Sequence, residues 1–531
     1  MEQKLTILEG EFWWGGVTAQ SYLMPFGKDS DYEVDLETVG TNMQINPAFL
    51  SNKGRCIFDE HSYKISFKHG EITITSENGV KIVEAGKTLM DAHDYLYKHF
   101  YAKDTDKLSD IMFSKPEYCT WVKFFKDQNE KGILEYAQSI LDAGLPAGVF
   151  IIDGSWQEEF GVWDFHPGRF KDPVGMIEKL KAMGFTVVIW IFPFINACGD
   201  VFLNAEKQGV LIKGHDGKPK IIRWWSGYAP AIELLSPEGD AYFKNSLQQI
   251  ADKYHAEGFK FDGGHMYCYQ DCDLYGGAKA EDECRKFPLY GKLYPFCEVR
   301  NTFGNGGVRM NFRMADRHHN WNDSFGIKSI VPCIIVMGLM GYPFACPDML
   351  GGGEINNFKK SQNSLSTELF CRFAEASAFM PIIQLSYDFW CQFDERTAAI
   401  CKSYCKLRTE MSDFFLSIKK ECENTDRPIV RSIAYQTNER PDIMDQFFFG
   451  SELMVAPVTD EGATGREVYL PAGKWKYYDK EYDGGQTVFI NAPIGVLPVF
   501  ERKDANIGIH NIIRSVMKEN GANFDRIFNG E

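Results

Sequence analysis

The sequence predicts an α/β protein, a (β/α)8 TIM barrel flanked by an N-terminal and a C-terminal β-sandwich. Residues 1–108 contain short strands that alternate polar and apolar residues. Residues 109–420 alternate apolar strands with helices, and residues 421–505 return to short strands between glycines and prolines. Because 531 residues are too many for one hydrophobic core, we predict three domains and a C-terminal tail, 506–531.

The N-terminal domain is predicted to be an antiparallel sandwich. Glu71–Ser76 alternates polar and apolar residues, which is typical of a strand with one face in a core. Glu77, Asn78 and Gly79 form a turn signal, and Val80–Val83 gives the next strand. Short strands divided by such turns favour stacked antiparallel sheets.

The central region alternates strands with helices, as a parallel barrel requires. Gly148–Asp153 and Thr186–Ile191 are almost entirely apolar, which is expected of strands buried on both faces. Ser236 and Pro237 predict the start of a long helix, as N-cap and first helical residue. The other predicted elements are strands at Thr120–Phe125 and Gly258–Phe261 and helices at Ile133–Leu145 and Met176–Met183.

The C-terminal region returns to short strands. The candidates are Asp445–Gly450, Leu453–Val458, Arg466–Pro471 and Gly473–Trp475. Glycine and proline turns between them favour a second sandwich. The polar tail is expected to pack loosely, and it could mediate contacts in a homo-oligomer.

The bulk composition argues against several classes of partner. The net charge of −16 disfavours binding to nucleic acid or to an anionic membrane. No apolar run reaches the roughly 18 residues of a membrane span, and Ile330–Met340 is predicted to be a buried helix. The N-terminus lacks the apolar segment of a signal peptide, and the fourteen cysteines include no C-x-x-C pair. We therefore expect a cytoplasmic protein with reduced thiols and without a metal or organic cofactor.

Two carboxylates follow apolar strands in the barrel region. Asp262 comes directly after Gly258–Phe261, and Asp316 ends the segment that begins at Asn311. The C-terminal ends of barrel strands form the active-site face, where a pair of carboxylates suits glycoside hydrolysis. A single Asp after a strand is more often a turn or helix cap, so the pair needs support from its surroundings.

Several strings along the chain supply that support. They are Phe150–Trp156, Phe259–Asp262, Phe312–Arg317, Leu339–Phe344, Pro347–Met349 and Leu470–Trp475. In this order they resemble glycoside hydrolase family 31, the retaining α-glycosidases. Within the family the chain is most similar to the branch that contains myogenesis-regulating glycosidase and galactosidase-like bacterial members. The resemblance covers most of the chain from about residue 115 to residue 500.

The resemblance implies roles for the two carboxylates. The family nucleophile follows a barrel strand, the position that Asp262 occupies. The family also has an Arg sixteen residues before its acid/base Asp and a Trp five residues after it. Arg300 and Trp321 stand at these distances from Asp316, whereas Asp323 fits neither spacing and is interpreted as a helix N-cap. Asp316 is therefore predicted to be the acid/base, and a general acid needs a raised pKa. Arg300 is predicted to be a clamp for sugar hydroxyls.

Other residues are implied to bind the sugar. Asp153 ends a barrel strand and corresponds to a carboxylate that accepts hydrogen bonds from sugar hydroxyls, and Asp348 resembles a second such ligand. Lys260 shares a strand face with Asp262 and would help to keep that carboxylate ionised. Beyond this, Lys260 either contacts the substrate directly or belongs to an internal ion pair.

Tryptophans complete the predicted sugar pocket. Trp121, placed in the first barrel strand, matches a pocket position of the galactosidase-like branch. Trp156 and Trp190 stand at strand ends and could form a hydrophobic wall, although Trp190 fits core packing equally well. Trp321 lies near the acid/base. Either Trp224 or Trp225 contacts the sugar in this branch, and we favour Trp225.

Two departures from the family pattern bear on the sugar. Gly263, Gly264 and His265 follow the nucleophile where α-glucosidases carry Met, Asn and Glu. The segment Ala378–Gln384 lacks the Arg-Asn-His string of those enzymes. We therefore expect a retaining exo-α-galactosidase that acts on an oligosaccharide or glycoside. The alternatives are an α-glucosidase or α-xylosidase, or a carbohydrate-binding protein without activity.

Overall fold

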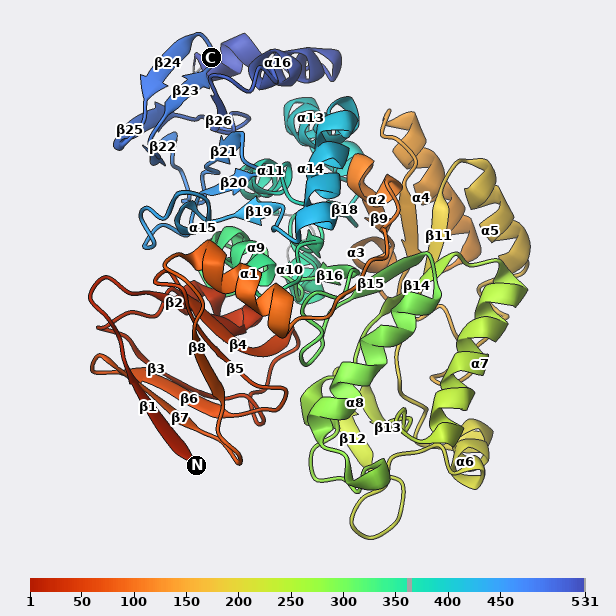
Figure 1. The fold of residues 1–531 in the computed structure, drawn as a ribbon. Helices are drawn as coiled ribbons and strands as arrows, with labels where there is room; N and C mark the ends of the chain where they lie inside the picture. Colours follow the sequence, from red (N-terminus) through yellow and green to blue (C-terminus); the bar gives the residue numbers. More distant parts are fainter. Residues whose placement is uncertain (361–364, 530–531) are drawn as a thin grey trace.

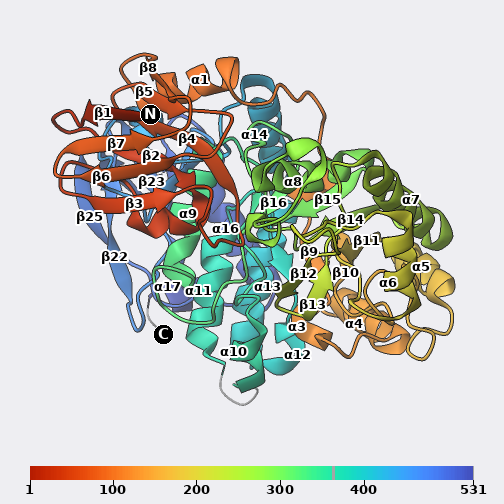
Figure 2. The same cartoon turned by 90° about the horizontal axis from the view of Figure 1, so that it is seen from below.

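The computed structural model describes residues 1–360 and 365–529 and contains a β/α barrel between two β-rich domains. In Figure 1 the N-terminal domain lies at the lower left, the barrel strands run through the centre, and the C-terminal domain lies above. Figure 2, turned by 90°, again separates the N-terminal sandwich from helices α4–α7 on the far side of the barrel. The predicted fold class is confirmed.

The N-terminal domain is a sandwich of two four-stranded antiparallel sheets, ordered β1-β7-β6-β3 and β2-β4-β5-β8. Its elements are β1 (Glu2–Thr6), β2 (Trp13–Val17), η1 (Thr18–Leu23), β3 (Asp31–Asp35), β4 (Ile45–Ser51), β5 (Arg55–Phe58), β6 (Lys64–Lys68), β7 (Glu71–Thr75), β8 (Lys81–Glu84) and α1 (Leu89–His99). Phe26, Tyr32 and Phe67 stack in its core, with Phe26 centroids 4.2 and 4.9 Å from the other two rings. The predicted turn at residues 77–79 connects the two sheets, because β7 and β8 belong to different ones.

The barrel is an eight-stranded parallel sheet in the order β17-β16-β15-β14-β11-β10-β9-β18. Its strands are β9 (Glu117–Cys119), β10 (Val149–Ile152), β11 (Thr186–Ile191), β14 (Gly258–Phe261), β15 (Phe296–Val299), β16 (Asn311–Arg313), β17 (Ala345–Cys346) and β18 (Gln384–Leu385). A parallel bridge between Met349 and Gln384 joins the two ends of this order and nearly closes the barrel. The carboxyl ends of all eight strands therefore meet at one mouth.

Helices surround the barrel strands. They are α2 (Ile111–Ser114), α3 (Trp121–Phe124), α4 (Glu130–Asp142), α5 (Pro173–Ala182), α6 (Gly199–Gln208), α7 (Pro237–Tyr254), α8 (Ala280–Lys286), α9 (Ile330–Leu339), α10 (Ile355–Lys360), α11 (Thr367–Ser377), α12 (Phe389–Gln392), α13 (Glu395–Glu410) and α14 (Ser412–Thr425). Short 3-10 turns occur at η2 (Met266–Cys268), η3 (Tyr275–Gly277), η4 (Phe287–Leu293) and η5 (Ile327–Ser329). Ser236 caps α7 by accepting from Gly239 N, as predicted, and every residue of α9 is buried.

The first barrel strand differs from its prediction. Thr120–Phe125 was expected to be the strand, but β9 ends at Cys119 and helix α3 follows at once. Phe124 N donates to Thr120 O at 3.0 Å and Phe125 N to Trp121 O at 2.7 Å, which closes a helical turn. A short apolar run can form either a strand or a buried helical turn, and its periodicity does not separate the two.

The C-terminal domain contains a six-stranded sheet, ordered β19-β20-β21-β26-β23-β24, and a two-stranded sheet of β22 and β25. Its elements are β19 (Val430–Arg431), α15 (Ile433–Thr437), β20 (Phe447–Phe449), β21 (Leu453–Val455), β22 (Gly465–Leu470), β23 (Lys474–Tyr477), β24 (Lys480–Asp483), β25 (Gln486–Asn491) and β26 (Val499–Arg502). Trp475 and Phe500 are fully buried between the sheets. The four predicted strands correspond to β20, β21, β22 and β23.

The last residues are not loosely packed, in contrast to the prediction. They form α16 (Ile509–Glu519) and α17 (Phe524–Phe528), and α16 packs against α13. Ile509, Ile513, Val516 and Met517 of α16 are buried at helical spacing. This amphipathic pattern, interrupted by polar residues, gives the tail its polar average composition.

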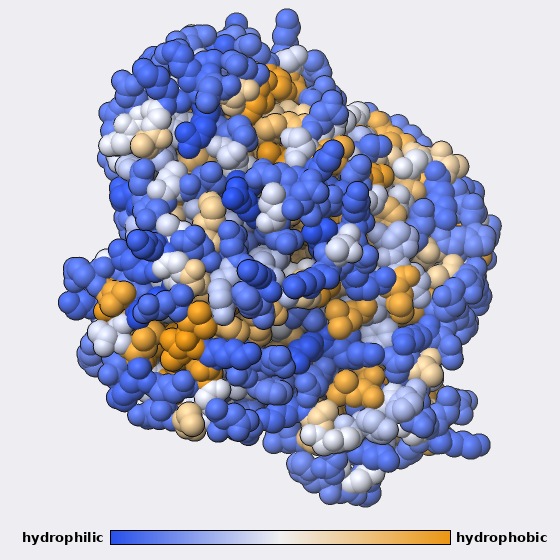
Figure 3. Space-filling model, viewed as in Figure 1, coloured by the Kyte–Doolittle hydropathy of each residue, from blue (hydrophilic) through white to orange (hydrophobic). Residues whose placement is uncertain are grey.

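The face of the molecule in Figure 3 is largely hydrophilic, with separate hydrophobic patches. Within residues 1–360 and 365–529, no helix combines the length and apolarity needed to cross a membrane. All fourteen cysteines are free thiols, and most are buried. Cys198 and Cys391 are the exposed ones.

Candidate active site

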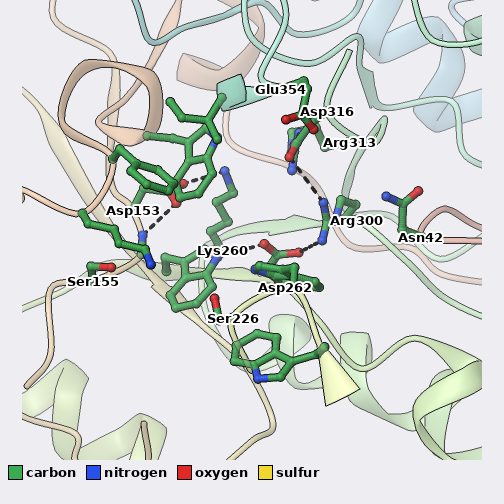
Figure 4. Close-up of a pocket in the computed structure, with 18 of the residues that line it drawn as sticks. Asn42, Asp153, Ser155, Ser226, Lys260, Asp262, Arg300, Arg313, Asp316 and Glu354 are labelled. Carbon is green, nitrogen blue, oxygen red and sulfur yellow. Dashed lines mark hydrogen bonds and ion pairs between the residues drawn. The ribbon is translucent and has the colours of Figure 1, made fainter. Parts of the chain in front are cut away.

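A cavity of about 720 Å³ opens at the carboxyl ends of the barrel strands (Figure 4). Its lining combines cations, carboxylates and aromatic rings. Seven of the predicted site residues line it: Trp121, Asp153, Trp225, Lys260, Asp262, Arg300 and Asp316. The other lining residues used below are Asn42, Trp190, Trp224, His265 and Arg313.

Asp262 follows β14 directly and is held by two side-chain donors. Arg300 Nη2 lies 2.7 Å from Asp262 Oδ1, and Trp190 Nε1 donates to Oδ2 at 3.0 Å. Burial alone would raise the pKa of this carboxyl. The charges of Arg300, Arg313 and Lys260, together with the Trp190 hydrogen bond, outweigh burial, so the pKa of Asp262 lies well below its ordinary value. Asp262 is therefore a carboxylate at neutral pH.

Two glycines let the chain turn sharply after Asp262. Gly263 and Gly264 have φ angles of 75° and 67°, in the left-handed region that favours glycine. A Cβ at Gly263 would lie 2.7 Å from a Phe194 ring atom, and one at Gly264 2.8 Å from Phe287. The two glycines thus allow the loop to bring His265 back to the cavity wall.

Asp316 lies three residues beyond β16 and is the less buried of the two carboxylates. Its side chain is 24% exposed, against 10% for Asp262. Arg313 Nη1 donates to Asp316 Oδ1 at 2.9 Å, and Arg300 Nη1 lies 3.7 Å from Oδ2. Burial raises the pKa of Asp316, but the charges of Arg313 and Arg300 lower it by more, so the pKa lies below its ordinary value. The raised pKa expected of an acid is therefore not present in this arrangement.

Arg300 connects the two carboxylates. Its guanidinium contacts both, and Figure 4 shows Asp262 and Asp316 approaching it from two sides. Trp225 covers this guanidinium, with its ring centroid 4.8 Å from Arg300 Cζ. Gln44 of the N-terminal sandwich donates from Nε2 to the carbonyl of Arg300 at 2.5 Å. The sandwich therefore helps to fix the bridging arginine.

Asp153 and Lys260 form a second charged group in the cavity. Asp153 follows β10, and Lys260 Nζ donates to its Oδ2 at 2.7 Å. Both side chains are at most 4% exposed. The structure thus contains the internal ion pair that was one interpretation of Lys260. Lys260 also lines the cavity and lowers the pKa of Asp262.

Aromatic residues cover the cavity. Trp121 belongs to α3, is half-buried and donates from Nε1 to Gly353 O at 2.8 Å. Trp224 and Trp225 both line the cavity, but Trp224 is 5% exposed and Trp225 46%. Trp225 is thus the freer of the two to meet a ligand. The imidazole of His265 lies 5.4 Å from the Trp225 ring, and burial lowers its pKa to about 3, so it is neutral.

Three predicted site residues lie outside the cavity lining. Trp156 is fully buried and donates from Nε1 to the carbonyl of Trp190 at 2.7 Å. Trp321 is partly buried and packs against the core. Asp348 is buried, where it pairs with Arg313 Nη1 at 2.5 Å and accepts from Gly353 N at 2.8 Å. Each of them supports a cavity residue or the fold instead of lining the cavity.

Asp323 is not the helix cap that was predicted. It is exposed, and Asn322 Oδ1 accepts the backbone N–H of Phe325 at 3.0 Å and of Gly326 at 2.6 Å. An Asn side chain accepts such bonds as well as an Asp does, so neighbouring candidates are hard to separate in sequence.

Sequence reasoning did not identify Arg313 or Glu298 as part of this site, and it left Trp190 as either a wall residue or a core residue. Trp190, Lys260 and Glu298 are register partners on β11, β14 and β15, so they lie side by side. A charge inside an apolar strand is costly unless it is paired. Lys260, Glu298 and Arg313 are charged residues inside otherwise apolar strands, and this pattern in the sequence indicates that they pair with one another.

One group of metal-ligand residue types occurs in the described part of the chain, formed by Glu117, Glu298 and Cys346. Glu298 is already engaged, because its Oε1 lies 3.0 Å from Arg313 Nε and 3.3 Å from Lys260 Nζ. Burial raises the pKa of the Cys346 thiol well above its ordinary value and that of Glu117 to about 8. Two neutral ligands beside two cations disfavour a metal ion.

Comparisons with known proteins agree with this architecture. The TIM-barrel domain of glycosyl hydrolases family 31 matches residues 112–418, and the C-terminal domain of the same family matches residues 426–507. A sulfoquinovosidase from E. rectale, in complex with an aza-sugar inhibitor, has a TM-score of 0.81 at 15% identity, over 98% of this chain and 84% of that one. That likeness shows a shared fold.

Curated relatives are similar over most of this chain. Myogenesis-regulating glycosidase of Mus musculus is 28% identical over 77% of this chain and 59% of its own length. The sulfoquinovosidase of Escherichia coli strain K12 is 24% identical over 76% of this chain and 64% of its own length. The chain thus spans less than two thirds of these relatives. Since the barrel match alone spans more than half of the chain, the protein belongs to glycoside hydrolase family 31.

Proposed function

We propose that this protein is a retaining, exo-acting α-glycosidase that releases terminal α-linked galactose. The observation that carries the proposal is the Arg300 bridge, which joins Asp262 and Asp316 inside a cavity at the carboxyl ends of the barrel strands. A retaining mechanism needs two carboxyl groups about 5–5.5 Å apart, one as nucleophile and one as acid and base. A single compact guanidinium between two carboxylates supports a separation of this order.

Asp262 is the proposed nucleophile. Three cations and the Trp190 hydrogen bond keep it ionised despite its burial. Its carboxylate would attack the anomeric carbon and displace the leaving oxygen, forming a covalent glycosyl-enzyme. Water would then release the sugar with retained configuration.

Asp316 is the proposed acid and base, and its contact with Arg313 has a mechanistic consequence. As acid it must carry a proton, but Arg313 at 2.9 Å stabilises the charged form. We therefore expect a bound glycosidic oxygen to take the place of Arg313 beside Asp316 Oδ1. In the second half of the reaction Asp316 must be a base, and Arg313 and Arg300 favour that state.

Asp153, Lys260 and Trp225 would bind the sugar. The carboxylate of Asp153 can accept hydroxyl hydrogen bonds, and Lys260 holds it in place at 2.7 Å. The exposed face of Trp225 can stack on the C–H face of a pyranose.

The preference for galactose rests on the pocket residues that differ from the α-glucosidase pattern. Gly263, Gly264 and His265 stand where α-glucosidases carry Met, Asn and Glu, and His265 places a neutral imidazole at the cavity. The named activities of relatives support a second candidate, an α-glucosidase or α-xylosidase. They include neutral alpha-glucosidase AB of Homo sapiens and alpha-xylosidase XylQ of Lactiplantibacillus pentosus.

The test is hydrolysis of aryl α-galactoside, α-glucoside and α-xyloside by wild type, Asp262→Asn and Asp316→Asn, with anomeric configuration followed by NMR. We expect galactose to be released as the α-anomer, and each variant to lose at least about a thousandfold in kcat/KM. Asp323→Asn, an exposed neighbour, is the matched control and should retain activity. Near wild-type turnover in either cavity variant would contradict the pair. Faster hydrolysis of the glucoside or xyloside would select the second candidate. Sugar binding without hydrolysis would indicate a protein that only binds carbohydrate.

A further inference from the structure

Glu298 does not line the cavity, but it contacts two of the cations that do. It belongs to β15 and is 2% exposed. Its Oε1 lies 3.0 Å from Arg313 Nε and 3.3 Å from Lys260 Nζ, and Oε2 accepts a short hydrogen bond from Gln384 Nε2. Three strands and the closing segment of the barrel thus meet at one carboxylate.

Each of the two cations leads on to a different cavity carboxylate. Lys260 Nζ contacts Asp153 Oδ2 at 2.7 Å, on the side proposed to hold the sugar. Arg313 Nη1 contacts Asp316 Oδ1 at 2.9 Å, on the side proposed to transfer protons. Glu298 is therefore linked to Asp153 through Lys260 and to Asp316 through Arg313.

The burial of this network makes its charge balance important. Lys260 is 3% exposed and Arg313 1%. A buried cation that loses its partner keeps its desolvation cost, and it then acts more strongly on the remaining charges nearby. Arg313 and Lys260 both lower the pKa of Asp316. Asp348 pairs with Arg313 at 2.5 Å and Asp153 with Lys260, but among the described residues Glu298 is the carboxylate that contacts both cations, so its charge limits their effect on Asp316.

We propose that Glu298 is a positioning residue that holds Lys260 and Arg313 in place together and thereby sets the charge around Asp153 and Asp316. It touches no cavity space itself and acts through the two cations. This role deepens the proposed glycosidase function and rests on it.

The first test is the pH dependence of kcat/KM in Glu298→Gln, which removes the charge and keeps the shape. Without Glu298 the two cations stabilise ionised Asp316 further, so the alkaline limb should move to lower pH by about one unit. We expect kcat to fall roughly tenfold or more while KM changes less, since proton donation is affected more than sugar binding. Glu298→Asp keeps the charge, and it should restore most of the alkaline limb.

Glu117→Gln is the matched control. Glu117 is 1% exposed and belongs to the same buried group, where Gln384 Nε2 lies 3.1 Å from its Oε2, but no ion pair joins it to Lys260 or Arg313 among the described residues. Because burial, followed by the charge of Glu298, raises its pKa to about 8, an amide resembles its state at neutral pH. This variant should keep the wild-type alkaline limb. An equal shift in both variants would mean that the group is only structural and would overturn the proposal.

A second measurement does not depend on turnover. Crystal structures of wild type and Glu298→Gln should show that Lys260 or Arg313 leaves its partner, Asp153 or Asp316, in the variant. Unchanged pairs together with an unchanged pH profile would overturn the positioning role. If wild type hydrolysed no α-glycoside, the proposed function would fail, and the crystal structures alone would decide whether Glu298 positions the two cations.

Discussion

Asp262 stays ionised in a buried site because its neighbours compensate for its lost hydration. Burial opposes the charge, while three cations and one indole N–H favour it. The indole of Trp190 is neutral, so its contribution can be removed without changing the charge of the site. It therefore offers the cleanest measure of how the nucleophile is tuned.

Trp190→Phe should raise the pKa of Asp262, since the lost hydrogen bond of 3.0 Å stabilised the charged form. A carboxylate with a depressed pKa loses its charge as the pH falls through that pKa, so a raised pKa moves the acidic limb of kcat/KM to higher pH. A hydrogen bond to a charged group contributes about 1.5–3 kcal/mol, which corresponds to roughly a ten- to hundredfold loss of kcat/KM. Steady-state kinetics across pH would measure both effects.

Trp156→Phe is the control for this prediction. It removes another buried indole N–H, one that donates to the carbonyl of Trp190 and not to Asp262. It should lower stability and leave the acidic limb in place. If both variants shifted the limb alike, packing around β11 would explain the result better than the Asp262 hydrogen bond.

The position of the site residues could be predicted better than their pairing. Asp262 and Asp153 follow strands whose apolar sequences locate their ends. That Arg300 contacts Asp262 more closely than Asp316 depends on how β15 and β16 tilt relative to β14, which spacing along the chain does not encode. The same holds for Arg313, whose donation to Asp316 has no signal in the spacing.

At the scale of elements, a buried carboxyl pair joins α8 to the turn that precedes α7. Glu283 of α8 accepts the N–H of Leu235 at 3.0 Å and of Leu234 at 3.3 Å. Glu233, 6% exposed, lies beside Glu283. Burial, followed by the interactions with the Glu233 side chain, raises the pKa of Glu283 well above its ordinary value of 4.5. Glu283 therefore holds a proton at neutral pH.

This proton makes stability depend on alkaline pH. A raised pKa in the folded state means that the folded protein binds a proton that the unfolded chain releases. The resulting stabilisation is complete below about pH 4.5 and declines by up to about 1.4 kcal/mol per pH unit as the pH rises towards the raised pKa. Glu283→Gln mimics the protonated form, so its melting temperature should fall less between pH 6 and pH 9 than that of wild type.

Thermal melting at several pH values would measure this difference. Asp282→Asn, which neutralises a partly exposed carboxylate of the same helix, is the control and should keep the wild-type pH dependence. A parallel alkaline decline in wild type and Glu283→Gln would show that Glu283 does not hold the proton.

Elements with strong local signals were predicted well. Thr186–Ile191 forms β11, and Ser236 caps α7. Thr120–Phe125 was misassigned because half-buried aromatic residues suit both a strand and a helical turn. In the tail, the four buried apolar residues of α16 pack against α13, which lies about a hundred residues earlier in the chain, so the sequence near α16 alone does not show that they are buried.

At the scale of the whole molecule, the N-terminal sandwich forms part of the cavity. Asn42 lines it, and Gln44 donates from Nε2 to the carbonyls of Arg300, at 2.5 Å, and Arg313, at 3.0 Å. Gln44 itself is fully buried and accepts from Thr18 Oγ1 at 2.9 Å. A residue of one domain thus fixes the backbone beside both arginines of another.

Gln44→Ala should weaken catalysis from outside the barrel. Two hydrogen bonds to the carbonyls of Arg300 and Arg313 are lost, and small shifts of catalytic groups can reduce rates about a hundredfold. We expect kcat/KM to fall roughly ten- to hundredfold. Asn46→Ala removes another bond from the sandwich to the barrel, from Nδ2 to Met340 O at 2.7 Å, and should lower stability only. Equal kinetic losses in the two variants would point to general loosening of the domain interface.

The contact between Gln44 and the two arginines also bears on how such a protein can change over evolutionary time. Recombination that exchanged the sandwich for an unrelated module would remove the support of Arg300, even if every barrel residue were kept. The sandwich and the barrel must therefore be inherited together for the pocket to keep its arrangement. New substrate preferences are more accessible through α3, which carries Trp121, and through the turn that carries Trp225, because both segments lie outside the contact between Gln44 and the two arginine carbonyls.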